Sequence, residues 1–382
     1  ISDYLILATM MSLRLVHSSA RFGSTNVSSG KARFLSTKVL CARVEMADPS
    51  DEGPLRRWLE TSLQVHGPSL RVHAVLGKTE GNGCVNDFSR GLASRAVGSI
   101  FGGTTTIMSG GTEGVLCPHY TVLATYDDTA EGTLTTAGGG LALGTARTRV
   151  FLPEEIGTVA QIEATRDAVV RACQAANLNP LTELAWAQIK CPLVTSQQVK
   201  EAKAARGADA CDDAYESMAQ SRRASAQGVR LAAGETTENF SALASTSAGV
   251  ELDHSEVLVL GNSPSSASDL KIVQTVMRDA LDAPAVFEAC ERAGLEYSRG
   301  QLTPQAQRRV AAVLCKADPA PQIRGHRTTM FTDSDFNATR HSRAAVAGLL
   351  SGIFADTRIF VSGGAESQGP PGGGPFAIIY DD

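Results

Sequence analysis

A three-part pattern of lysine, arginine and serine occurs three times along this chain, always in that order. The serines open strings of the form Ser-(Gly/Ala)-Gly-x-Glu, which begin at Ser109, Ser247 and Ser362. Ordered self-similarity at this scale indicates a chain built from copies of one supersecondary unit. The repeated residues are reactive or charged, whereas a purely structural repeat would preserve its apolar positions. The pattern therefore predicts a shared site as well as a repeated fold.

Each lysine ends an apolar run that has the character of a buried strand, and each arginine opens a helical run rich in Ala, Leu and Val. The lysines are Lys78, Lys190 and Lys316, and the arginines are Arg90, Arg222 and Arg340. From arginine to serine the separations are 19, 25 and 22 residues. The helical segments are predicted over 92–101, 224–233 and 342–354, and further amphipathic helices over 54–63, 159–176 and 283–294.

These patterns predict an α/β protein of three homologous units. We place repeat unit A at 37–135, repeat unit B at 141–253 and repeat unit C at 254–382. The Gly- and Thr-rich segment 129–148 and the Ser-, Asn- and Pro-rich segment 261–268 have the composition of linkers between units.

The N-terminal segment has a different composition. Residues 4–44 contain no acidic residue but several arginines and many serines, which is typical of an organelle transit peptide. We therefore predict a leader over 1–36 and import into a mitochondrion or plastid. The alternative is an upstream region read through, with Met10 or Met11 as the start and a cytoplasmic protein.

Composition argues against several partners. The formal net charge is -5 and aromatic residues make up 5%, with no basic stripe, so nucleic acid is not an expected partner. The sequence has no apolar run of membrane-spanning length, so no membrane is expected either. The eight cysteines form no C-x-x-C pair and are expected to be buried free thiols.

The chemistry follows from which basic group accompanies each serine. A serine hydroxyl needs a base within hydrogen-bond reach to act as a nucleophile. No histidine recurs with the serine in all three repeats, whereas a lysine does. This favours a Ser–Lys dyad. Burial and neighbouring arginines lower the pKa of a lysine. Three such sets around one axis fit a ring of alternating C=O and N–H groups, opened through an acyl-enzyme and then water.

Seven longer strings resemble those of the cyanuric acid hydrolase and barbiturase family of ring-opening cyclic amide hydrolases. They are 77–87, 108–116, 151–157, 189–193, 215–218, 333–341 and 362–375. The resemblance implies a three-fold pseudo-symmetric barrel of the three α/β units, with helices outside and the site on the pseudo-three-fold axis. It also implies a homotetramer that acts on a small cyclic amide.

The resemblance assigns roles residue by residue. It implies catalysis by Lys190 and Ser247, with supporting dyads completed by Lys78 and Lys316. The implied substrate contacts are Arg90, Ser109, Gly110, Arg222, Ser247, Ala248, Arg340, Ser362 and Gly363. A structural Mg²⁺ or Ca²⁺ is implied, with no organic cofactor, and its ligands are Asp318, Ala365, Gln368, Gly369, Pro370 and Gly373.

The sequence departs from the family at two places. Asp318 stands where the family has a glutamate, and the segment between Arg90 and Ser109 is shorter than usual, which would reshape one wall of the site.

Three functions are compatible with this sequence: hydrolysis of cyanuric acid to carboxybiuret, hydrolysis of barbituric acid to ureidomalonate, and non-catalytic binding of cyclic amides. Phe336 is the candidate for sensing the ring CH₂ that distinguishes barbituric acid.

Overall fold

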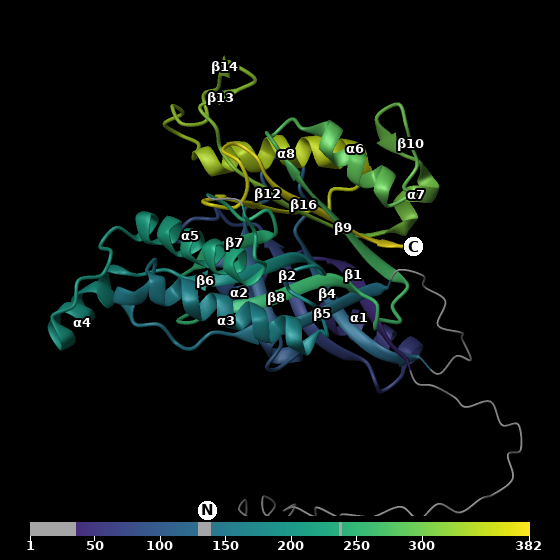
Figure 1. The fold of residues 1–382 in the computed structure, drawn as a ribbon, viewed down its shortest axis with the longest axis horizontal. Coiled ribbons are helices and arrows are strands. Elements are labelled where there is room, and N and C mark those ends of the chain that lie inside the picture. Colours follow the sequence, from purple (N-terminus) through teal and green to yellow (C-terminus); the bar gives the residue numbers. More distant parts are fainter. Residues whose placement is uncertain (1–35, 129–138, 237–238) are drawn as a thin grey trace, which may run out of the picture. The chain divides into compact units, whose positions relative to one another are not determined.

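The computed structural model describes residues 36–128, 139–236 and 239–382 (Figure 1). The leader predicted over 1–36 lies outside these residues except for Ser36, which opens the first strand. No helix in the described ranges combines the length and apolar character that crossing a bilayer requires.

Three four-stranded sheets share one topology, in which the fourth strand of each unit lies between its first and second. The second and third strands pair in parallel and the other neighbours pair antiparallel. The first sheet has the order β1 (Ser36–Glu45), β4 (His119–Asp128), β2 (Arg71–Thr79), β3 (Thr105–Gly110). The second has β5 (Gly140–Arg147), β8 (Glu256–Ser263), β6 (Leu184–Pro192), β7 (Ala244–Gly249). The third has β9 (Leu270–Met277), β16 (Gly374–Asp381), β12 (Val310–Ala317), β15 (Phe360–Gly363).

Two main helices accompany each sheet, and the predicted segments all fall within or across them. They are α1 (Gly53–His66), α2 (Ser89–Ile100), α3 (Val159–Ala175), α5 (Ala214–Ala232), α6 (Ala283–Arg292) and α8 (Ala338–Phe354). Side-chain caps start several of them, such as Thr158 before α3 and Asp213 before α5. The shorter elements are η1 (Pro153–Glu155), α4 (Ser196–Arg206), α7 (Pro304–Arg309), β10 (Tyr297–Ser298), β11 (Gln301–Leu302), β13 (Gln322–Ile323) and β14 (His326–Arg327).

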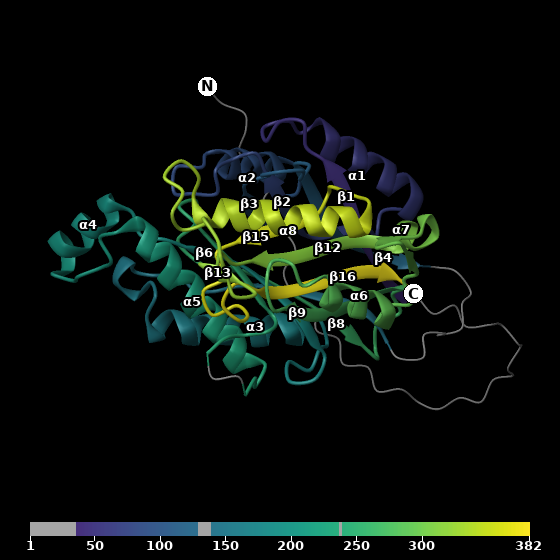
Figure 2. The same cartoon turned by 90° about the horizontal axis from the view of Figure 1, so that it is seen from above.

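The two faces of each sheet enter different cores. On one face Leu76, Trp186 and Leu314 belong to a single apolar cluster that the three sheets share. On the other face Val75, Ala187 and Val313 pack in separate clusters with the helices of their own unit. Figures 1 and 2 show these helices on the outer side, with α6 and α8 along β12 and β16. Because strand side chains alternate between faces, Lys78 and Lys316, two residues beyond Leu76 and Leu314, and Lys190, four residues beyond Trp186, also face inward.

A closed barrel, as the resemblance implied, is not observed. In the described part of the chain the strands form three four-stranded sheets and two two-stranded ones, and no ladder joins one four-stranded sheet to the next. The sheets meet through side chains of the shared cluster rather than through backbone hydrogen bonds. The observed fold is thus a mixed α/β fold with several sheets around one core.

The boundaries of the second unit differ from the sequence prediction. The predicted linker 129–148 contains β5, and β8 lies beyond the boundary placed at 253/254 although it pairs with β5 and β6. Because the segment that contains β5 is rich in glycine, its composition predicts a linker rather than a strand. The structure explains one of these glycines, since a Cβ on Gly144 would lie 2.0 Å from the carbonyl oxygen of Ala172 in α3. Glycine is needed at that position because the helix backbone crosses the strand closely.

Candidate active site

The three lysine–serine sets occupy the same position in each sheet. Lys78 is the register partner of Ser109, Lys190 of Ser247 and Lys316 of Ser362, on the parallel strands that follow one another in each unit. All three lysines are at most 1% exposed. The parallel pairing places each pair at the carboxyl end of its strands, where ligands bind in α/β sheets.

One cavity collects residues from all three sets. It is lined by Gly83, Arg90, Ser109, Gly110, Lys190, Met218, Arg222, Ser247, Ala248, Arg343, Ser362 and Gly363. The structure therefore brings together the three predicted serines, the small residues that follow them, and two of the predicted arginines. The cavity volume is about 20 Å³, close to the smallest space that holds one water.

The third arginine at the cavity is Arg343 rather than the predicted Arg340. Arg343 is 3% exposed, while the Arg340 side chain is 31% exposed and lies over the ring of Phe336 at 4.3 Å. The two residues are three positions apart in α8, so they lie almost one turn apart. A sequence signal for Arg343 did exist: a Ser-Arg dipeptide occurs in the corresponding helix of each repeat, at Ser89, Ser221 and Ser342.

Ion pairs link the three units in a cycle. Arg343 of the third unit pairs with Glu113 of the first at 2.6 Å, and Arg222 of the second pairs with Glu366 of the third at 2.6 Å. Arg90 of the first unit approaches Glu251 of the second at 3.8 Å. Each glutamate is the last residue of a Ser-(Gly/Ala)-Gly-x-Glu string. The arginine of one unit is thus held by the serine string of another, a pairing that no local sequence signal predicts.

Burial lowers the pKa of all three lysines, and a nearby arginine lowers it further. The pKa of Lys190 falls to about 8 by burial, with Arg90 acting in the same direction and Glu251 opposing. The pKa of Lys316 falls to about 7 through burial and Arg222, and that of Lys78 falls well below its usual range through burial and Arg343. An amine with a pKa near neutrality is partly unprotonated and can act as a base.

The middle set differs from the other two in its hydrogen bonds. Lys316 Nζ donates to Ser362 Oγ at 3.0 Å, and Lys78 Nζ contacts Ser109 Oγ at 3.5 Å. Lys190 Nζ instead donates to the carbonyl oxygens of Met108 and Ala248 and pairs with Glu251 at 3.1 Å. The buried Ser247 Oγ has no hydrogen-bond partner among the described residues.

The residues predicted to bind a cation come together at the third serine string. Asp318 accepts hydrogen bonds from the backbone N–H groups of Ala365 and Gly372, which places this acid inside the loop 364–374. Gln368 is fully buried, and its side-chain oxygen accepts from the N–H of Thr246. Phe336, the predicted specificity residue, is absent from the cavity lining and instead packs on Arg340 and His341.

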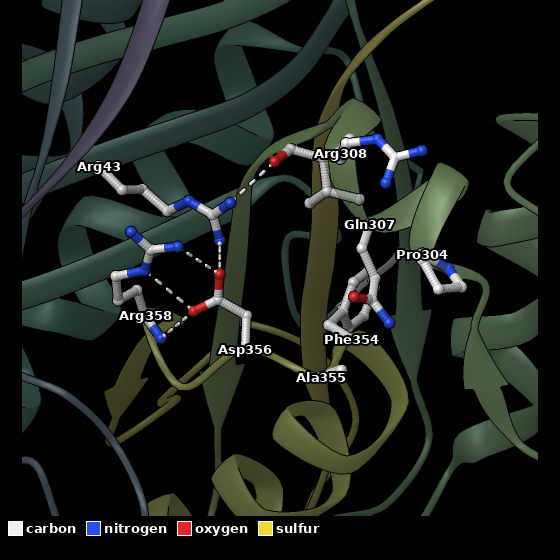
Figure 3. A pocket seen from close by; sticks show the side chains of 9 residues that line it. Arg43, Pro304, Gln307, Arg308, Phe354, Ala355, Asp356 and Arg358 are labelled. Atoms are coloured by element: carbon white, nitrogen blue, oxygen red, sulfur yellow. Dashed lines mark hydrogen bonds and ion pairs between the residues drawn. The ribbon is translucent and has the colours of Figure 1, made fainter.

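A larger cavity lies between β1, α7 and the end of α8, away from the repeated residues (Figure 3). Its volume is about 440 Å³, and Arg43, Arg308 and Arg358 line it together with Asp356. Arg43 and Arg358 both pair with Asp356, at 2.9 and 2.8 Å. No serine, lysine or other nucleophile lines it, so size alone does not make it the candidate site.

Comparison with known proteins identifies the family of this chain. Residues 40–381 match the sequence model of the family described as amidohydrolase ring-opening protein. This chain belongs to that family of ring-opening amidohydrolases, which are hydrolases that act on C–N bonds.

Named relatives are similar over most of their length. A cyanuric acid amidohydrolase from Ectopseudomonas oleovorans is 44% identical, covering 90% of this chain and 99% of the relative. One from Rhizobium johnstonii is 45% identical, covering 89% of this chain and 97% of the relative. The solved cyanuric acid hydrolase from A. caulinodans superposes with a TM-score of 0.80 at 39% identity, covering 90% of this chain and 99% of that structure.

Proposed function

We propose that this chain hydrolyses cyanuric acid to carboxybiuret, with Ser247 as the nucleophile and Lys190 as its base. The observation that carries the proposal is one cavity lined by the serines of all three lysine–serine register pairs, by Lys190 and by three buried arginines. The names of the relatives support cyanuric acid as the substrate.

The three-fold arrangement suits the shape of the substrate. Cyanuric acid carries three carbonyl groups and three N–H groups in alternation, so each unit meets the same chemical pattern. Arg90, Arg222 and Arg343 present fixed donors to ring oxygens, and the serines present hydroxyls that both donate and accept. Because the binding groups belong to rigid strands and helices, the ring is held in one plane before reaction.

Acylation begins with proton transfer from Ser247 to Lys190. A neutral amine has two N–H bonds and one lone pair, whereas Lys190 Nζ faces three acceptors in Met108, Ala248 and Glu251. The neutral amine can donate to only two of these acceptors, and we propose that its lone pair takes the proton of the Ser247 hydroxyl, which has no other partner among the described residues. The Oγ atom attacks a ring carbonyl carbon, a C–O bond forms, and the proton on Nζ moves to the leaving ring nitrogen as the C–N bond breaks.

Deacylation uses one water. The water oxygen attacks the ester carbonyl, its proton passes to Lys190 and then to Ser247 Oγ, and the opened chain leaves with a new carboxyl group. The backbone N–H beside Ser247 suits the developing oxyanion, where one donor contributes about 3 kcal/mol.

The test is incubation of purified protein with cyanuric acid and, separately, with barbituric acid while ring absorbance is followed. We expect loss of the cyanuric acid ring, and no loss after Lys190→Ala or Ser247→Ala. Loss of only the barbituric acid ring would favour the barbiturase alternative, and loss of neither would favour a non-catalytic binder. Full activity in either variant would refute the Lys190–Ser247 assignment.

We also propose that Asp318 and the loop 364–374 hold a structural Mg²⁺ or Ca²⁺. Asp318 is half-buried and no cationic side chain in the described residues forms an ion pair with it, so a bound cation would compensate its charge. The described residues hold no cluster of three or more His, Cys, Asp or Glu, so backbone carbonyls would supply most ligands. These are oxygen ligands that hard cations prefer. Bound there, the cation would fix the loop that follows Ser362.

A further inference from the structure

A second cavity reaches Lys190 from another side, and we call it the α2 groove. Its volume is about 520 Å³. One wall is α2 with the turn after it, including Ser94, Gly98 and Thr104, and the other includes Glu251 after β7. Lys190 lines both this groove and the cavity of the three serines, whereas none of the three serines lines the groove.

Deacylation creates a need for a second route into the site. The serine-lined cavity has a volume of about 20 Å³ without substrate, so it must widen to admit the ring, and a ring-opened acyl group on Ser247 then occupies the space next to that serine. The water must nevertheless reach the ester carbonyl from a side where Lys190 can take its proton. The α2 groove is large enough for ordered water, and Lys190 is one of the residues that line it.

Each Ser-(Gly/Ala)-Gly-x-Glu string ends in a glutamate, and of these three glutamates only Glu251 lines the α2 groove. Glu113 and Glu366 each hold an arginine by two hydrogen bonds, from Arg343 and Arg222. Glu251 has only the 3.8 Å approach of Arg90 and pairs with Lys190 at 3.1 Å. Its carboxylate therefore has acceptor capacity left for a water that enters along the groove.

We propose that the α2 groove is the entrance for the water of hydrolysis. The inference rests on the proposed function, because it assigns a route to that reaction. The water passes Glu251, attacks the ester carbonyl of the acyl-enzyme, and gives its proton to Lys190, which returns it to Ser247 Oγ as the ester C–O bond breaks.

The chain offers a way to fill the groove without disturbing the backbone. Gly98 is exposed on α2, lines the groove, and a Cβ added there would meet no atom within 4 Å. Gly98→Phe therefore places a ring in the groove, and Gly98→Ala adds only a methyl group. Gly348 on α8 is also exposed, and an added Cβ there would meet no atom within 4 Å. Because Gly348 does not line the groove, Gly348→Phe is the matched control.

The measurement is steady-state kinetics on cyanuric acid, combined with intact-protein mass spectrometry after an acid quench. If Gly98→Phe slows water entry, kcat falls at least tenfold and KM falls with it. The ratio kcat/KM, which reports the steps through acylation, stays within twofold, and a mass adduct of the ring accumulates on the protein. Gly98→Ala and Gly348→Phe should keep the wild-type kcat and show no adduct.

Two results would overturn the inference while leaving the proposed function intact. One is a wild-type kcat in Gly98→Phe. The other is an equal fall in kcat and kcat/KM without an adduct, which would mean a distorted site rather than a blocked entrance. A wild-type protein that opens no ring would instead refute the proposed function, and this inference with it.

Discussion

Lys190 differs from Lys78 and Lys316 in having a carboxylate, Glu251, at ion-pair distance. Glu251 raises the pKa of Lys190 against the lowering by burial and Arg90, and the result is a pKa of about 8. Among three nearly equivalent amines, this one therefore titrates slightly above neutral pH, and its carboxylate neighbour is what separates it from the others.

Activity should rise with pH because the base is the neutral form of Lys190. Below a pKa of about 8, kcat/KM should fall tenfold per pH unit, and above it kcat/KM should level off. The measurement is kcat/KM for cyanuric acid between pH 6 and pH 10. A profile that stays flat across this range would exclude Lys190 as the titrating base.

Glu251→Gln should move that profile toward acid. Removing the carboxylate removes an influence that raises the pKa of Lys190, so the amine becomes neutral at lower pH. The inflection of kcat/KM should therefore shift to lower pH. Glu201→Gln on the exposed side of α4 serves as the control and should leave the inflection in place.

Arg343 and Arg340 should respond differently to removal. Arg343→Ala leaves Glu113 buried without its 2.6 Å partner and removes a donor from the cavity, so ring binding and stability should both be lost. Arg340→Ala removes the 3.1 Å ion pair between the partly exposed Arg340 side chain and Glu113. We expect this pair to contribute no more than about 1 kcal/mol to stability. Activity and thermal unfolding of the two variants, measured side by side, check this. Equal losses of activity in the two variants would indicate that Arg340 also contributes to the site.

At the scale of elements, glycines set how closely helices approach each other and the sheets. Gly228 lies in α5, the helix that carries Arg222, and a Cβ there would come within 2.7 Å of Thr165 Cβ in α3. The packing of α5 on α3 therefore fixes where Arg222 reaches the cavity.

Gly228→Ala should push the two helices apart. Overpacking of this kind costs about 1–3 kcal/mol, so the melting temperature should fall by several degrees, and KM should rise as Arg222 moves. Gly348→Ala, which adds a methyl group in open space on α8, should instead stabilise by up to about 1 kcal/mol. Thermal unfolding followed by circular dichroism distinguishes them, and an unchanged Gly228→Ala protein would contradict the packing argument.

The loop 364–374 should respond to metal removal. Treatment with EDTA should lower the melting temperature if Asp318 and loop carbonyls hold a divalent cation, and excess Mg²⁺ or Ca²⁺ should restore it. Asp318→Asn should start from the lower value and lose the response to both treatments. A wild-type protein indifferent to EDTA, with no metal found by elemental analysis, would refute the cation proposal.

At the scale of the whole molecule, the cycle of arginine–glutamate pairs holds the three units in register around the cavity. The Arg343–Glu113 pair is the most buried, with both side chains 4% exposed. Glu113→Gln should cost about 3–5 kcal/mol of unfolding free energy, because it leaves a buried guanidinium uncompensated. Chemical denaturation measures this free energy, and a cost below about 1 kcal/mol would mean that the cycle of ion pairs does not stabilise the packing of the three units.

The expected homotetramer stays a prediction that light scattering can check.

The amino-acid sequence by itself determined the local parts of this protein. The apolar runs ending in Lys78, Lys190 and Lys316, the serine strings and the two main helices of each unit followed from periodicity and repetition, because strand and helix patterns are local properties. What only the tertiary structure decided depends on residues distant along the chain. The pairing of β8 with β5 and the separate sheets in place of a closed barrel are of this kind. Pairing between strands and ion pairs between units follow from how the units pack around a shared core, which no single segment encodes.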